Sequence, residues 1–159
     1  MVTHRLRNAR ILPALAAGAV VGATGVALAF NLPYLLETGT GGTLLVLLTF
    51  VVALVVWALG LAVIGAPLWG LAERAGLRGP HHAIALGFGT TFLAAALLLL
   101  VMDGGVVTLR DGGRTLVDQG MRTPWGLWVL VRDSGLFALL GGLVALVVWR
   151  IAYRRGAAA

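Results

Sequence analysis

The stretch TLLVLLTFVVALVVWALGLAVIGAPLW, residues 43–69, contains no charged side chain. A helix crosses the hydrocarbon core of a bilayer, about 30 Å thick, with roughly 20 apolar residues that rise 1.5 Å each. Charged side chains at such a depth are costly, and none interrupts this run. The stretch therefore predicts a membrane-spanning helix.

The composition of the whole chain also places it in lipid. Of its 159 residues, 60% are hydrophobic and 11% are charged, whereas a soluble domain carries about 25% charged residues. The deficit is too large for a surface in water, and the abundant apolar side chains exclude a disordered chain. Cysteine is absent, which excludes disulfides, thiolate metal sites and a cysteine nucleophile.

Three further apolar runs are long enough, or nearly so, to cross a bilayer. We expect an all-α integral membrane protein, one domain over residues 1–159, that folds as a bundle of four transmembrane helices. We expect Pro33 to end the first helix and Pro67 to kink the inner end of the second. Thr123-Pro124 supplies a capping hydroxyl and a first-turn proline to the fourth helix. The predicted helices cover residues 11–32, 43–69, 82–102 and 124–153.

The arginines indicate which helix ends face the cytoplasm. All twelve basic residues are arginine, and four crossings place eight of them on one side. Because arginine accumulates in cytoplasmic loops, we expect a multi-pass protein of the inner (plasma) membrane with both termini in the cytoplasm. The aromatic residues Trp69, Trp149 and Tyr153 fall at the same predicted inner edge. The eight arginines are Arg5, Arg7, Arg10, Arg74, Arg78, Arg150, Arg154 and Arg155.

The first span has a second interpretation. Three arginines, an apolar core and the A-x-A motif Ala27-Leu28-Ala29 also fit a cleaved secretory signal. The apolar run exceeds the usual length of roughly 7 to 15 residues for a signal core, so we favour a retained helix. The orientation of the other three spans is the same in both cases.

One segment between the helices has a β pattern. Residues 104–122 read GGVVTLRDGGRTLVDQGMR, in which β-branched runs flank a DGG turn. This pattern predicts a small extracytoplasmic β-hairpin. With Gly112-Gly113 as the turn, opposite charges and two leucines face each other across the strands. The expected pairs are Asp111 with Arg114, Arg110 with Thr115, and Leu109 with Leu116.

Four charged residues at the predicted outer helix ends form the candidate site: Glu37, Asp103, Arg132 and Asp133. We interpret Arg132 and Asp133 as markers of the outer boundary of the last span rather than as a site at the midplane. An ion-pair network that pins the helix ends is favoured over a weak cation site. Hard cations need several convergent oxygens, and Arg132 already supplies a positive charge that can pair with these carboxylates.

We find no constellation for catalysis, a cofactor or a metal. His81 and His82 are neighbours, so they point about 100° apart on a helix and do not form a bidentate metal site unaided. The single serine, Ser134, has no histidine on its predicted side of the membrane, which excludes an intrachain serine–histidine triad. We find no ionisable residue at depth, which disfavours proton- or ion-coupled transport. We expect no cofactor and no metal.

The sequence supports three hypotheses on function. We favour a non-enzymatic partner-binding or structural membrane component. It would contact the lipid bilayer and a membrane-protein partner or a second copy through the hairpin or through faces of small residues such as Ala58-Ala62-Ala66. The alternatives are an oligomeric channel or uncoupled permeation unit, and an enzyme that acts on lipid or envelope substrates at the outer interface. The arginines cluster at span ends instead of forming a basic stripe on a soluble face, so we expect no nucleic-acid partner.

Overall fold

The computed structural model describes residues 2–38, 43–77, 79–102, 108–111 and 113–153, with side-chain detail for these except residues 2–11, 33–35, 37 and 38. The described residues are mostly helical (85%), with a small three-stranded sheet. Four helical segments are long and apolar enough to cross a membrane, which confirms the prediction of four apolar spans. They cover Leu12–Leu32, Thr43–Arg74, Pro80–Met102 and Pro124–Tyr153.

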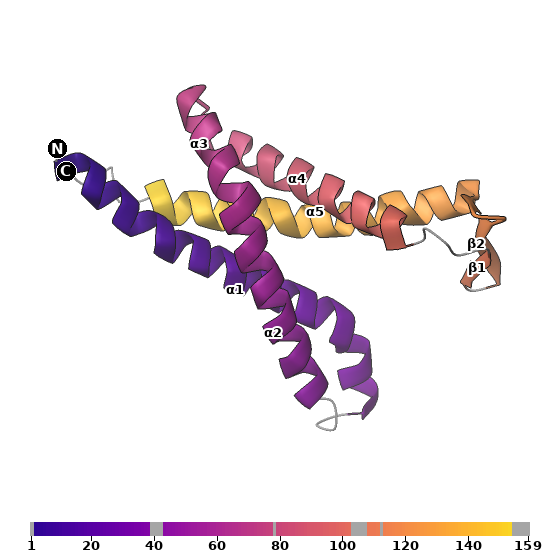
Figure 1. Cartoon of the computed structure of the whole chain (residues 1–159). Helices are drawn as coiled ribbons and strands as arrows, with labels where there is room; N and C mark the ends of the chain where they lie inside the picture. The colour runs from indigo at the N-terminus through magenta and orange to yellow at the C-terminus, as the bar shows by residue number, and fades with distance from the viewer. Residues whose placement is uncertain (1, 39–42, 78, 103–107, 112, 154–159) are drawn as a thin grey trace.

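Figure 1 shows the elements in chain order. The helices before the sheet are α1 (Val2–Thr38), α2 (Thr43–Gly60), the π-helix η2 (Leu61–Gly65), α3 (Ala66–Arg74) and α4 (Pro80–Met102). The strands β1 (Thr108–Asp111), β2 (Arg114–Asp118) and β3 (Met121–Arg122) follow, and α5 (Pro124–Tyr153) completes the described chain.

Helix α1 does not end at Pro33, as we expected, but continues to Thr38. A proline inside a helix removes one backbone hydrogen bond, and transmembrane helices tolerate this loss. The same region holds Asn31, a buried polar residue that the sequence analysis overlooked; its side chain is 3% exposed. Its amide donates to the Ala27 carbonyl oxygen at 2.8 Å, so the polar group is satisfied on its own helix.

A π-helix lies directly before Pro67, where we expected a kink. Segments α2, η2 and α3 follow one another without a break, and the Ala66 N–H donates to the Leu61 carbonyl, five residues back. This wider turn comes directly before Pro67, which lies in the first turn of α3. A π-bulge is one of the recognised causes of a helix bend.

The helices form an open row in the order α2–α1–α5–α4, because α1 packs on α2 and on α5, and α5 packs on α4 (Figure 1). Among the described residues, α2 and α4 make no comparable contact with each other. The core lies where α1, α5 and η2 converge, around Ala14, Val144 and Val148, with Trp57, Leu61 and Trp69 packed against them. We use the name α3 end for the end of the molecule where α3 meets the last turns of α5. The sheet lies at the other end of α5 (Figure 1).

Helix α5 packs on α4 through glycines. A Cβ added at Gly87 would meet the Gly141 carbonyl oxygen, and one added at Gly141 would meet the Gly87 carbonyl and the Thr91 side chain. The two backbones therefore approach each other directly, as expected of small-residue faces in lipid. Ala58 of α2 and Ala62 of η2, also small residues four positions apart, are exposed and pack on no neighbouring helix in this way.

The segment after α4 forms a three-stranded antiparallel sheet, where we had expected a two-stranded hairpin. Two of the predicted pairs are present, Asp111 with Arg114 and Arg110 with Thr115. The third is wrong, because a bulge after Leu109 shifts its partner from Leu116 to Val117. Leu116 and Val117 are both buried, and the Leu116 carbonyl accepts the Thr123 N–H at 2.9 Å.

Thr123 and Arg122 tie the sheet to the helices. The Thr123 hydroxyl accepts the Gly126 N–H at 3.0 Å and donates to the Thr115 carbonyl at 2.7 Å, so the predicted cap of the last helix is confirmed. The Arg122 guanidinium donates to the Gly126 carbonyl at 2.9 Å and to the Leu99 carbonyl at 3.3 Å. It thereby joins the last turn of α4, where helix carbonyls lack partners of their own, to the first turn of α5.

The glycine contact between α4 and α5 gives a test of the packing. We expect Gly141→Val to lower the free energy of unfolding by about 1–3 kcal/mol, because its side chain must displace the Gly87 backbone. Gly135→Val on the same helix is the matched control, since a Cβ there meets nothing within 4 Å. Thermal unfolding in detergent measures both, and equal losses would contradict the close approach.

Candidate functional site

The structure describes only half of the predicted outer network. Arg132 Nε donates to Asp133 Oδ1 at 2.8 Å, and the two side chains are 51% and 36% exposed. The Glu37 side chain and Asp103 lie outside the described residues, so the four-residue network stays a prediction. The end of α1, which carries Glu37, lies well apart from the sheet end of α4 and α5 (Figure 1).

Two other polar positions from the sequence analysis lie in the helices. Ser134 is 0% exposed, and its hydroxyl has no partner among the described residues; a serine in a helix can turn to bond a carbonyl of the preceding turn. His81 and His82 contact each other, with ring centroids 3.9 Å apart. No group of three metal-ligating side chains forms within the described part of the chain.

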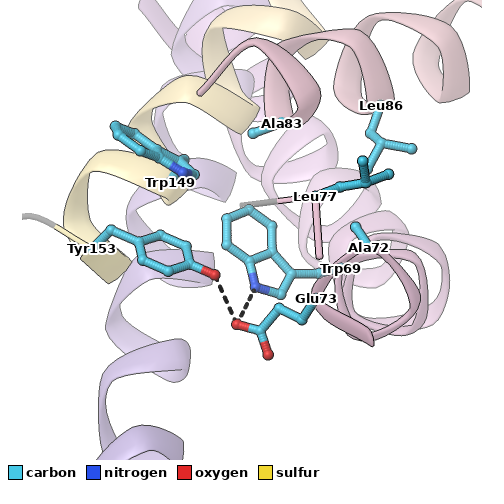
Figure 2. A pocket seen from close by; sticks show the side chains of 8 residues that line it. All are labelled: Trp69, Ala72, Glu73, Leu77, Ala83, Leu86, Trp149 and Tyr153. Carbon is cyan, nitrogen blue, oxygen red and sulfur yellow. Dashed lines mark hydrogen bonds between the residues drawn. The ribbon is translucent and has the colours of Figure 1, made fainter. Parts of the chain in front are cut away.

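The polar cluster that joins separate helices lies at the α3 end. Glu73 of α3 accepts two hydrogen bonds on the same oxygen, Oε1 (Figure 2). Tyr153 Oη donates at 2.8 Å from the last turn of α5, and Trp69 Nε1 donates at 3.3 Å from the preceding turn of α3. The carboxylate therefore links α3 to α5 across 80 residues of sequence.

Local structure places each member of this cluster. Trp69 and Glu73 are four residues apart, so they lie on one face of α3. Helix α3 then ends in a Schellman motif: Gly76 has φ 77°, and the Leu77 N–H donates to the Ala72 carbonyl at 2.9 Å. This turn leads the chain into α4 and leaves Glu73 in the last turn of α3, next to α5.

Three aromatic rings form a ladder beside the carboxylate. Tyr153 stacks on Trp69, with centroids 5.8 Å apart, and on Trp149, with centroids 5.7 Å apart. Trp149 lies one turn before Tyr153 on α5. Stacked aromatic pairs contribute about 0.5–1.5 kcal/mol beyond the area that they bury, so the ladder holds α3 against the end of α5.

Charge at this end is strongly one-sided. Of the six carboxylates in the chain, Glu73 alone lies among the segments that carry the eight arginines. Within the described chain no arginine pairs with it, and its donors Trp69 and Tyr153 are neutral. Arg74 and Arg150 are exposed and form no ion pair with a described residue. Glu73 is thus a half-buried carboxylate that has no ion pair with a described residue.

A small pocket lies between the ladder and α4. Its space is about 10 Å³, room for about one water molecule. The pocket therefore has no room for a cofactor or a drug-sized ligand, and it accepts a group of the size of water or ammonium. Its lining consists of Trp69, Ala72, Glu73, Leu77, Ala83, Leu86, Trp149 and Tyr153 (Figure 2).

The aromatic residues of this cluster are predicted from the sequence, but the acceptor, Glu73, is not. Trp69, Trp149 and Tyr153 were assigned to the inner edge as interfacial residues. Glu73 was not connected to them, although two signals were present: its spacing of four from Trp69, and its isolation among arginines. The bond to Tyr153 joins distant segments, which no local pattern indicates.

No family model, curated protein or solved structure matches this chain. The candidate site is therefore defined by its own geometry: one carboxylate, two neutral donors and a water-sized space at the end of three helices.

Removal of one donor tests whether the cluster holds α3 against α5. Tyr153→Phe keeps the ring stack but deletes the hydrogen bond to Glu73, and we expect a loss of about 1 kcal/mol in unfolding free energy. Glu73→Gln should cost less, because its amide oxygen still accepts from both donors. Thermal unfolding in detergent ranks the two variants, and a neutral Tyr153→Phe would contradict a role for this bond.

Proposed function

We propose that this chain is a multi-pass protein of the inner (plasma) membrane that acts as a non-enzymatic component and binds a membrane-protein partner. The observation that carries the proposal is the open row of helices. In the most apolar 18 residues of each span, 33% of the residues of α1 and 28% of those of α5 are buried within the chain, against 6% for Thr43–Arg74 and 0% for α4. Each end helix packs on one neighbour and leaves its other face open to lipid or to another transmembrane helix.

The small-residue face of α2 favours another helix over lipid. Apolar contact gives little driving force inside a bilayer, and helices associate where small residues allow close approach. Ala58 of α2 and Ala62 of η2 lie on one helix face, and both are exposed. The pocket at the α3 end holds about one water, which gives no support to an enzyme site there.

The proposed orientation puts the α3 end in the cytoplasm and the sheet outside. Five of the eight arginines lie in described helices, at the beginning of α1, the end of α3 and the end of α5, and these helix ends belong to the same end of the molecule (Figure 1). Arginine-rich ends face the cytoplasm. Gly18 of α1 packs against Val144 and Val148 of α5, which supports a retained first helix because its removal would uncover the core.

Site-specific photocrosslinking in membranes tests partner binding. A crosslinker at Ala58 on α2 or at Leu93 on α4 should give a protein adduct of defined mass, since both positions are exposed. A crosslinker at Ala23, which is buried between helices, is the control and should give none. Adducts with lipid alone at both exposed positions would reject the proposal, and an adduct of twice the chain mass would identify the partner as a second copy.

Tags test the orientation separately. We expect reporters fused to the two chain ends to be active only in the cytoplasm, and a cysteine introduced at Gln119 in the sheet to react with an impermeant thiol reagent from outside. The native chain has no cysteine, so no background reaction occurs. A cytoplasmic sheet, or ends on opposite sides, would overturn the proposed topology.

A further inference from the structure

The Glu73 carboxylate has an unused oxygen. Oε1 receives both hydrogen bonds, from Tyr153 and Trp69, while Oε2 bonds to no described residue. Both donors are neutral, so the hydrogen bonds leave the negative charge without a described counterion. A half-buried carboxylate at a membrane boundary is costly unless a cation or water compensates it. The site therefore favours a cationic ligand.

The depth of the site points to lipid headgroups. Ala83 and Leu86, from the first two turns of α4, line the pocket together with Glu73. The apolar span of α4 begins at this level, which places the carboxylate where the hydrocarbon meets the headgroup region. Tryptophan and tyrosine gather at this depth in membrane proteins, and here Trp69 and Tyr153 donate hydrogen bonds to the carboxylate from one side (Figure 2).

The size of the pocket selects among the headgroup cations. A space of about 10 Å³ accommodates a group of the size of water. A primary ammonium fits this limit and donates hydrogen bonds to a carboxylate oxygen. A trimethylammonium group is larger and has no N–H to donate. The rings of Trp69 and Tyr153 add cation–π attraction to an ammonium placed beside them.

Two exposed arginines complete the match to a zwitterionic headgroup. Arg74 follows Glu73 on α3, and Arg150 lies one turn before Tyr153 on α5; neither forms an ion pair with a described residue. Arginine binds phosphate through charge-assisted hydrogen bonds. A carboxylate flanked by arginines thus complements a group that carries an ammonium next to a phosphate.

We propose that Glu73, with Trp69 and Tyr153, binds the primary ammonium of a phosphoethanolamine lipid headgroup, and that Arg74 and Arg150 bind its phosphate. The site lies at the end of α3 and α5, away from the exposed faces of α2 and α4. Lipid binding here is therefore independent of partner binding.

Native mass spectrometry of the full chain in mixed-lipid nanodiscs tests the proposal. Wild type should retain dioleoylphosphatidylethanolamine over dioleoylphosphatidylcholine by about tenfold, the ratio expected from one charge-assisted hydrogen bond. Glu73→Gln should abolish this preference, because its amide keeps the acceptor for Tyr153 but not the charge. Asp118→Asn, which neutralises an exposed carboxylate on β2, is the matched control and should retain it.

A second variant tests the site without changing Glu73, so that a folding defect of Glu73→Gln cannot be mistaken for loss of lipid binding. Arg150→Gln leaves the hydrogen bonds of Glu73 intact, and we expect it to lower phosphatidylethanolamine retention severalfold. Equal retention of the two lipids by wild type, or an undiminished preference in Glu73→Gln, would overturn the site.

Soluble phosphoethanolamine distinguishes the source of the ammonium: full competition at equal concentration would reject a lipid ligand, and weak competition would support it.

Discussion

The close approach of helix backbones at small residues is the interaction on which this fold depends. In a bilayer, contact between apolar side chains adds little free energy of association, because lipid is equally apolar. Helices therefore associate where their surfaces fit closely together. The contact of Gly87 with Gly141 is such a close approach between α4 and α5. Gly18 and Gly22 of α1 instead leave room for the side chains of Val144, Val148 and Trp57 on the neighbouring helices. Larger residues at these positions would separate the helices.

This constraint explains the open row of helices. A close contact between two helices needs small residues at matching positions. The central helices α1 and α5 each pack on two neighbouring helices. The end helices α2 and α4 each pack on one neighbouring helix, and lipid can cover the rest of their surface. The helices converge at the α3 end, where Val144, Val148 and Trp69 fill the core.

Polar chemistry is concentrated at the two ends of the helices, because the spans have few means to satisfy it. Asn31 and Thr24 bond the carbonyls of their own helix. At the sheet end, Arg122 and Thr123 satisfy the backbone of α4, α5 and β2. At the α3 end, Glu73 accepts hydrogen bonds from two helices on Oε1, and its Oε2 bonds to no described residue. The ends are therefore the places where this molecule can recognise polar groups.

The sequence by itself determined the four apolar spans, the cap at Thr123 and the first pairs of the sheet, because these follow from hydropathy, local hydrogen bonding and turn chemistry. It misplaced the end of α1, since a proline in lipid interrupts a helix less than a proline in water. The tertiary structure decided the order of helices, the unpacked face of Ala58 and Ala62, and the meeting of Glu73 with Tyr153. Those features depend on which small faces come into register across distant segments, and a linear pattern carries no information on that choice.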